Sequence, residues 1–479
     1  MDSDHFFSGP AREYRDSRIA HWDAVARKRD RWHGLGYWYH RRIAEIYSFL
    51  VGPGRSVLEI GCGQGDLLAA LRPSHGVGVD FSEEHITRGQ KKYPQLELIR
   101  ADAHELSPVQ GSFDAIIFSD TINDLWDVQR ALEQVRPFCS SRTRLILNFY
   151  SHLWEWPLAI VRWLHLATPN LDQNWLTRED VSNMLMLAGF EPIRFTREVL
   201  WPLPLGGFAN RFLVRFWPWS ELALANFVIA RPVPPAQGVK APQVSVIVPA
   251  RNEAGNIKSI FERVPRMGEK TELVFVEGHS RDDTYATIER EMAAHPQLPS
   301  LLFRQPGVGK ADAVRMGFSK AHGEILMILD ADLTVPPEDL PRFYSALVSG
   351  KGEFINGVRL VYPMEKEAMR IPNLLGNKFF SIAFSWLLGQ PIKDTLCGTK
   401  ALWREDYDRI SGGRAYFGDF DPFGDFDLIF GAAKLNCRIV DMPIRYQERS
   451  YGTTNISRWR HGFLLLRMVL FAAQRIKFV

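Results

Sequence analysis

Short apolar runs alternate with helix-length segments along the first half of the chain. Residues 56–60, 76–80, 96–99, 113–118 and 143–148 each have the length and composition of a buried strand. Buried strands that alternate with helices are typical of a mostly parallel sheet covered by helices. The pattern therefore predicts a β/α succession for this half.

The second half repeats this style with a different sequence. Strand-like runs cover residues 244–249, 272–277, 301–304 and 324–329, and helix-length segments separate them. No internal repeat relates the two halves. We therefore expect an α/β chain with two sheets, each the centre of its own domain.

A proline-rich stretch lies between the halves. Residues 231–242 (RPVPPAQGVKAP) hold four prolines in twelve residues, which cannot continue a helix and run as an extended connector. The chain, at 479 residues, is also too long for one hydrophobic core. We therefore expect domains at residues 1–230 and 243–479, joined by a linker at 231–242.

The composition limits the cellular compartment and the classes of partner that we expect. A formal net charge of +3 is too small for a nucleic-acid-binding protein. The four cysteines are far apart, without a C-x-x-C pair, which argues against a disulfide framework or a zinc site. Residues 1–18 are polar and lack the apolar core of a secretory signal. We expect a cytoplasmic protein.

Two apolar segments lie near the C-terminus, at residues 373–389 and 463–473. A membrane-spanning helix needs about 20 mostly apolar residues, and each segment is shorter or carries a cation. We expect them to lie as an amphipathic pair at the cytoplasmic face of a membrane; the alternative is two buried core helices. Aromatic residues at 154–163 and 201–219 fit a core, a substrate lid or a membrane contact.

The first chemical signature follows the strand at residues 57–60. The chain continues as GCGQGD (61–66) into an apolar helical segment, and these glycines permit a tight turn and a close approach to a ligand. A dinucleotide-binding turn has the spacing G-x-G-x-x-G, so this one argues against NAD. Asp80 and Asp102 end the next two strands, where they can reach a ribose and an adenine amine.

These motifs, with the strand FDAII at residues 113–117, resemble class I S-adenosylmethionine-dependent methyltransferases over about residues 40–230. The resemblance implies a Rossmann-like sheet and S-adenosyl-L-methionine as cofactor. It places the glycines along the methionine part, Asp80 at the ribose and Asp102 near the adenine. The cofactor-binding residues that it implies are Glu59, Gly61, Gly63, Gly65, Asp80 and Asp102.

The methyl acceptor is left open by the sequence. An alcohol needs help to lose its proton, whereas an amine needs only positioning and desolvation. Candidate side chains follow the fourth strand or lie in nearby aromatic segments: Asp120, Asn123, Asp124, His40 and His152. Each of them also has a plain alternative as a cap, surface or packing residue.

The second chemical signature lies at three strand ends in the second half. The strand at residues 244–248 runs into PARNE, the next strand ends in Glu277-Gly278, and the third delivers Asp330-Ala331-Asp332. Two aspartates around one small residue form a hard oxygen site that suits Mg²⁺ or Mn²⁺. Such an ion neutralises a leaving diphosphate.

The run VIVPARNE, the D-x-D triplet and GVGK (307–310) resemble glycosyltransferase family 2, with a GT-A fold, over about residues 243–450. The run DADLTVPPE (330–338) is similar to its dolichyl-phosphate mannose synthase-like branch. Glu277 stands where the family has two aspartates, so the base of the nucleotide stays open. The resemblance implies a nucleotide-sugar donor bound by Pro249, Arg251, Glu253, Glu277, Lys310 and Asp330, with Asp330 and Asp332 as metal ligands.

Two features of this half point to different sugar acceptors. By the resemblance, Asp425 is the catalytic base that deprotonates an acceptor hydroxyl, and Arg449 belongs to a segment that grips a lipid phosphate. Asn455 stands in place of the usual lysine of that segment. A phosphate is already ionised and needs no base, so both kinds of acceptor stay open.

Together the two resemblances imply a bifunctional enzyme. It would transfer a methyl group from S-adenosyl-L-methionine, and a sugar from a nucleotide-sugar to a glycan, glycolipid or polyprenyl-phosphate acceptor with the help of Mg²⁺ or Mn²⁺. The alternative is a single active glycosyltransferase with a degenerate methyltransferase-like binding module. A dinucleotide oxidoreductase is disfavoured by the glycine spacing.

Overall fold

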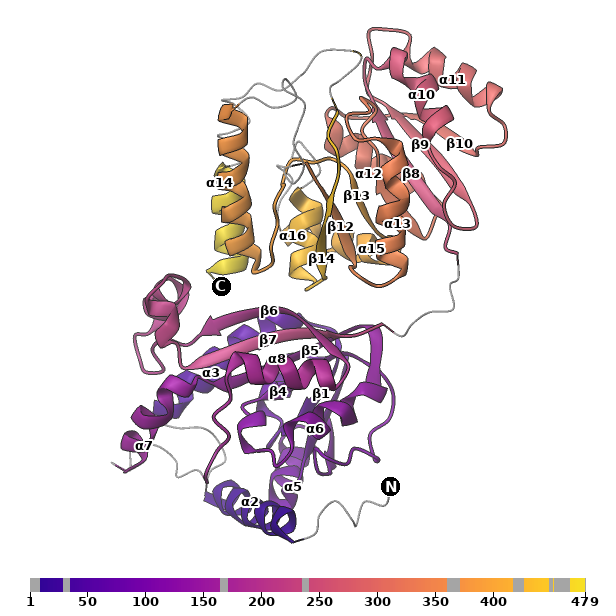
Figure 1. The fold of residues 1–479 in the computed structure, drawn as a ribbon. Coiled ribbons are helices and arrows are strands. Elements are labelled where there is room, and N and C mark those ends of the chain that lie inside the picture. Colours follow the sequence, from indigo (N-terminus) through magenta and orange to yellow (C-terminus); the bar gives the residue numbers. More distant parts are fainter. Residues whose placement is uncertain are drawn as a thin grey trace. The chain divides into compact units, whose positions relative to one another are not determined.

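The computed structural model describes residues 9–28, 35–163, 171–234, 241–359, 371–416, 426–447, 451 and 466–478. The chain forms two compact units (Figure 1). The first unit comprises Met1–Val233 with Phe478–Val479, and the second comprises Pro234–Lys477.

The first unit is built on a seven-stranded sheet with the order β3-β2-β1-β4-β5-β7-β6. Strands β1 to β5 run parallel, and β7 is antiparallel to both of its neighbours, β5 and β6. The strands are β1 (Ser56–Ile60), β2 (His75–Asp80), β3 (Glu97–Arg100), β4 (Phe113–Ser119), β5 (Cys139–Tyr150), β6 (Phe190–Glu198) and β7 (Ala225–Pro232).

Alternating residues of these strands enter two separate hydrophobic cores. Leu58 and Ile116 pack with α6 (Val128–Val135) and α8 (Arg178–Leu187) on one face. Their neighbours Val57 and Ile117 pack with α3 (Leu35–Val51), α4 (Asp66–Ala70) and α5 (Glu83–Lys92) on the other. Because both faces are covered, the strands read as continuous apolar runs in the sequence.

The second unit contains another seven-stranded sheet, with the order β10-β9-β8-β11-β13-β12-β14. Strands β8 to β11 are parallel, β13 is antiparallel to β11 and to β12, and β14 is parallel to β12. The strands are β8 (Val244–Ala250), β9 (Thr271–Glu277), β10 (Ser300–Arg304), β11 (Ile325–Ile328), β12 (Phe354–Val358), β13 (Lys400–Trp403) and β14 (Ile439–Pro443).

Helices cover both faces of this sheet as well. Val246 and Phe275 share a core with α10 (Ala254–Arg263), α11 (Thr284–Ala294) and α13 (Leu340–Val348). On the opposite face α12 (Lys310–Lys320) lies so close that a Cβ on Gly317 would come within 2.5 Å of Ile247. The predicted α/β class with two largely parallel sheets is confirmed, and every predicted strand overlaps an observed one.

The apolar segment at residues 373–389 largely coincides with α14 (Ile371–Leu388), which pairs with the C-terminal helical residues (Figure 1). Lys477 Nζ donates to the carbonyl of Trp386 at 2.8 Å. Phe384 is fully buried, whereas Ile382 is 72% exposed, so α14 has an apolar buried face and an apolar open one. Within the described residues, no helix is both long enough and apolar enough to cross a membrane.

Candidate active sites

The glycine turn after β1 requires its glycines. Gly61, Gly63 and Gly65 have φ values of +73°, +55° and +83°, in the left-handed region that other residues avoid. A Cβ on Gly61 would lie 2.5 Å from Thr121 Oγ1. The loop after β4 therefore presses directly against the turn.

Asp80 lies at the end of β2, beside this turn. Its Oδ2 accepts the backbone N–H of Gly63 at 2.9 Å, and its Oδ1 accepts the N–H of Ser82 at 2.9 Å. An ionised carboxylate offers about four acceptor positions. The two bonds therefore fix the side chain and leave it able to accept two hydroxyls of a ribose.

Asp102 follows β3 and binds its neighbour His104. Oδ1 of Asp102 accepts from His104 Nδ1 at 2.6 Å, while His104 Nε2 accepts the N–H of Asp127 at 3.1 Å. These bonds hold the imidazole between Asp102 and the backbone of Asp127. Asp102 is thereby held at the same sheet edge as Asp80.

Glu59 lies in β1 directly before the turn and is buried. Burial raises its pKa well above the usual value, and a bond to the backbone of Leu68 in α4 opposes that shift. Its Oε2 has no hydrogen-bond partner among the residues that the structure describes. An unpartnered buried acceptor beside a glycine turn fits a ligand that brings a donor, so these residues suit S-adenosyl-L-methionine.

The candidate methyl-acceptor residues separate clearly in the structure. Asp120 is part-exposed, and its Oδ1 accepts from Tyr39 Oη at 2.7 Å. Desolvation raises the pKa of Asp120 to about 6, and the hydrogen bonds from Tyr39 and Asn148 partly oppose this shift. This carboxyl is thus tuned to exchange a proton near neutral pH.

The other candidates have different surroundings. Asn123 is fully buried and binds the backbone of Asn174, and Asp124 accepts from Trp22 Nε1 of α2 (Pro10–Lys28) at 3.1 Å. Burial lowers the pKa of His40 to about 4. His152 is exposed beside Glu155.

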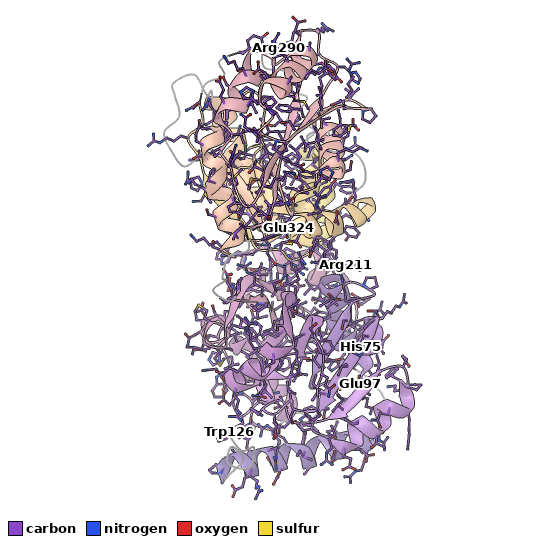
Figure 2. All side chains as sticks on the ribbon, turned by 90° about the vertical axis from the view of Figure 1, so that its right-hand side faces the viewer. His75, Glu97, Trp126, Arg211, Arg290 and Glu324 are labelled. Atoms are coloured by element: carbon purple, nitrogen blue, oxygen red, sulfur yellow. The ribbon has the colours of Figure 1, made fainter. Side chains whose placement is uncertain are left out.

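Helix α2 contacts the loop after β2 and the loop after β4. The Ser82 hydroxyl donates to the Asp23 carboxylate. Trp126, labelled in Figure 2, packs edge-on against Tyr14 at 5.1 Å between ring centroids. His75 of β2 and Glu97 of β3, also labelled there, are both exposed, and His75 Nε2 lies 3.5 Å from a carboxylate oxygen of Glu97.

The predicted donor site in the second unit gathers at the carboxyl ends of β8, β9 and β11. Ala250 pairs with Glu277 in register, and Gly278 donates its N–H to Ala250. Glu277 is buried and accepts the N–H of Ser280. Pro249 is half-buried and Arg251 is exposed at this edge.

Two polar residues brace the loop after β8. Glu253 is buried and accepts from Asn256 Nδ2 at 2.8 Å at the start of α10. Asn252 has a φ of +57°, and its Oδ1 accepts the N–H of Arg281 from the loop after β9. The two strand-end loops are thus tied together.

Lys310 and Asp330 form the charged centre of this site. Lys310 Nζ lies 2.6 Å from Asp330 Oδ1. Burial opposes ionisation of Asp330, but Lys310, Lys400 and Arg359 outweigh it and lower the pKa of Asp330. The cations around one ionised aspartate make a setting that suits a diphosphate.

The two aspartates fit a divalent cation. Asp332 Oδ1 accepts the N–H and the hydroxyl of Thr334, which fixes its side chain. A Cβ on Gly398 would lie 2.2 Å from Asp330 Oδ2, so only glycine leaves room there. Within the described residues, no cluster of three or more His, Cys, Asp or Glu forms a complete metal cage, and Mg²⁺ is commonly held by one or two carboxylates with substrate phosphates.

Comparison with known families identifies the two domains that carry these residues. A family model for "Methyltransferase domain" matches residues 35–194, and one for "Glycosyl transferase family 2" matches residues 245–410. The chain contains a methyltransferase domain and a family 2 glycosyltransferase domain. Both resemblances stated from the sequence are confirmed at this level.

Individual relatives match a part of the glycosyltransferase domain. The dolichol-phosphate mannosyltransferases of Saccharomyces cerevisiae and Pyrococcus furiosus are 36% and 33% identical over 110 residues, or 22% of this chain. The undecaprenyl-phosphate 4-deoxy-4-formamido-L-arabinose transferase of Edwardsiella ictaluri is 34% identical over 113 residues, also 22% of this chain. The match spans less than half of each relative: 41%, 31% and 34% of their lengths.

Two solved structures resemble the domains in outline. An S-adenosylmethionine-dependent methyltransferase from Thermotoga maritima aligns with 45% of this chain and 99% of its own, at 17% identity and a TM-score of 0.36. A glucosyl-3-phosphoglycerate synthase from Mycobacterium tuberculosis aligns with 49% of this chain and 80% of its own, at 18% identity and a TM-score of 0.35.

Three charged residues of the glycosyltransferase domain, two of them buried, were not predicted from the sequence. Arg359 after β12 forms a bidentate pair with Asp394 at 2.7 and 2.9 Å, and Lys400 of β13 is fully buried. The available signal was the run DTLCGTK (394–400), which places charges in an otherwise apolar region. Asp425, Arg449 and Asn455, by contrast, lie outside the described residues.

Proposed function

We propose that the chain is a bifunctional enzyme with one transferase site in each domain. The observation that carries the proposal is that each strand-end site keeps its carboxylates: Asp80 beside the glycine turn, Asp330 beside Lys310, and Asp332 fixed by Thr334. A turn that only glycines form readily, together with a carboxylate held beside it, favours a working site over a degenerate binding module.

In the methyltransferase domain, Asp80 binds the ribose of S-adenosyl-L-methionine, Asp102 approaches its adenine, and the turn at Gly61–Gly65 receives the methionine part. When bound, the cofactor supplies an electrophilic methyl group. The hydrogen bond from the Gly63 N–H to Asp80 holds the turn against the end of β2. The protein contributes positioning and the exclusion of water.

In the glycosyltransferase domain, Asp330 and Asp332 hold Mg²⁺ or Mn²⁺, and Lys310 binds the donor diphosphate. A bound ion would neutralise charge on the departing nucleotide. Pro249, Arg251, Glu253 and Glu277 form or brace the nucleotide side of the site.

The acceptor that we favour for sugar transfer is a polyprenyl phosphate. The relatives are named as transferases of dolichol phosphate and undecaprenyl phosphate, and Arg449 would bind the lipid phosphate. A hydroxyl acceptor with Asp425 as base is the competing choice. The domain division that we propose is residues 1–230 and 243–479, with a linker at 231–242.

A lipid-linked acceptor requires that the enzyme reach a membrane. We propose that the protein binds peripherally to the cytoplasmic face of that membrane. The paired helices α14 and 466–477 expose Phe379, Ile382 and Leu470, and Lys378 and Arg475 are exposed on the same pair. Apolar side chains edged by cations suit an interface with anionic lipid. The same helices bury Phe384, so they also belong to the core of their domain.

The direct test incubates the purified full-length chain with a panel of nucleotide sugars and undecaprenyl phosphate, and follows nucleotide release with and without Mn²⁺. We expect metal-dependent release that is lost in Asp332→Ala. A parallel assay with labelled S-adenosyl-L-methionine reports the methyltransferase site. Release that persists without metal or in Asp332→Ala would contradict the proposed donor site.

A further inference from the structure

Asp120 belongs to a loop that contacts the turn expected to hold the methyl donor. Strands β1 and β4 are adjacent, with Ile60 opposite Phe118. Thr121, the next residue after Asp120, donates its hydroxyl to the carbonyl of Ile60 at 2.9 Å and leaves no room for a Cβ on Gly61. Asp120 is thus one residue from the contact between the β4 loop and the glycine turn.

Side chains from two other elements fix this carboxylate. Tyr39 Oη of α3 donates to Asp120 Oδ1 at 2.7 Å, and Asn148 Nδ2 of β5 donates to the same oxygen. Asn148 Oδ1 in turn accepts from Tyr47 Oη and from the N–H of Asp120. Asp120 also has a φ of +56°, a costly conformation for a residue other than glycine. The fold therefore holds Asp120 in a set position.

Aromatic rings extend from Asp120. The rings of Tyr39 and Tyr150 lie 6.1 Å apart, and those of Tyr150 and Trp175 lie 6.5 Å apart. Tyr150 and Trp175 are part-exposed. A ring wall beside a single carboxylate is a suitable lining for a small ligand with apolar faces and hydroxyl groups, such as a sugar.

The segment that carries Trp175 is fastened to the loop after β4. Asn123 Nδ2 donates to the carbonyl of Asn174 at 2.7 Å, and the N–H of Asn174 donates to the carbonyl of Asn123 at 2.7 Å. The aromatic wall and Asp120 therefore keep a fixed relation to each other.

Tyr39 and Tyr47, which face Asp120, stay neutral near neutral pH. Burial first, and then the charge of Asp120, raises the pKa of both Tyr39 and Tyr47 well above the usual tyrosine value. Tyr150 is the remaining phenol of the cluster. The Asp120 carboxylate is thus the proton acceptor of this cluster.

We propose that this cluster is the methyl-acceptor site and that it takes a neutral hydroxyl group of a sugar ring. The inference rests on the proposed methyltransferase function. The acceptor oxygen forms its bond to the methyl carbon as the bond from that carbon to the sulfonium sulfur breaks, and the hydroxyl proton passes to the carboxylate of Asp120. The sulfur keeps the electron pair of the broken bond and leaves as a neutral thioether.

The first test compares wild type, Asp120→Asn and the matched variant Asp114→Asn, which alters an exposed carboxylate on β4, the strand that precedes Asp120. Labelled methyl transfer is measured to methyl glycosides of glucose, galactose, mannose and rhamnose, and to aniline as an amine probe. We expect transfer to a glycoside, reduced about 10²–10⁴-fold in Asp120→Asn and unchanged in Asp114→Asn. Wild-type rates in Asp120→Asn, transfer to aniline alone, or no transfer to any glycoside would overturn the inference.

The second test does not depend on turnover. Carboxyl ¹³C signals of aspartate-labelled protein are followed against pH. In wild type we expect one signal with a pKa of about 6. This signal should be missing in Asp120→Asn, and its pKa should be higher in Tyr39→Phe, because the hydrogen bond from Tyr39 lowers it. The absence of such a signal in folded wild type contradicts the inference. Calorimetry with S-adenosyl-L-methionine separates the two failures: if wild type does not bind it, the proposed function itself fails.

Discussion

Asp394 is fully buried and Asp120 is part-exposed, and their pKa values shift in opposite directions. Burial raises the pKa of Asp120 to about 6, while Arg359 overcomes burial and holds the pKa of Asp394 at about 2. If Asp120 accepts the acceptor proton, only its ionised form is active. We expect the methyl-transfer rate to rise as the pH increases through about 6 and to level off above it, in a pH–rate profile of the wild type. A rate that is flat from pH 5 to 8, or that falls, contradicts this role.

The lowered pKa of Asp394 concerns stability, because the ionised form of this residue stabilises the fold. Its folded pKa lies below the unfolded value of 3.8, so its contribution is present above that pH and is lost as the pH falls toward 2. We expect Asp394→Asn to destabilise the second unit by about 3–5 kcal/mol, since it leaves the charge of Arg359, a side chain only 12% exposed, unpaired. Denaturant unfolding at pH 7 measures this, with Asp339→Asn, in a part-exposed pair with Arg342, as a control that costs at most about 1 kcal/mol. Equal effects of the two variants would show that burial of the pair matters little.

At the scale of elements, helix α2 links the two loops that frame the methyltransferase site. Trp22 binds Asp124 after β4, and Asp23 binds Ser82 after β2. Trp22→Phe removes a hydrogen bond to an acidic group, worth about 1.5–3 kcal/mol when that group is ionised. We expect faster amide exchange across residues 10–28, measured by hydrogen-exchange mass spectrometry. Trp156→Phe, at a side chain that is 78% exposed on α7 (Glu155–Trp163), serves as the control. Unchanged protection of α2 in Trp22→Phe would show that the contact does not hold the helix.

The elements and motifs that the sequence predicts are those whose signal is local. The glycine turn at Gly61–Gly65 requires particular φ angles at neighbouring positions, so its residues identify it directly. The bond from Tyr39 to Asp120 joins residues 81 positions apart, and no local pattern encodes it. Lys400 was missed for a related reason: a lysine normally indicates solvent, whereas this one is fully buried among the cations around Asp330. Strand β13, which carries Lys400, was therefore not predicted from the sequence.

At the scale of the whole molecule, the exposed apolar face of the paired C-terminal helices predicts peripheral membrane binding. We expect the protein to float with anionic liposomes, to bind less at high salt, and to be released by carbonate. Ile382→Ser should weaken binding because it removes an apolar side chain that is 72% exposed, whereas Leu187→Ser, at a 60% exposed leucine in the other unit, should not. A protein that stays in solution with anionic vesicles, or that resists carbonate, contradicts this expectation.

The central claim is that one chain holds two working transferase sites, and calorimetric titration of the full-length protein tests it most directly. S-adenosyl-L-methionine and a panel of nucleotide sugars with Mn²⁺ are titrated separately into wild type, Asp80→Ala and Asp332→Ala. We expect wild type to bind both ligands, Asp80→Ala to lose about 1.5–3 kcal/mol of binding free energy for S-adenosyl-L-methionine alone, and Asp332→Ala to lose only metal-dependent binding of the nucleotide sugar. A wild-type chain that binds just one of the two ligands, or variants that weaken both equally, would contradict the claim.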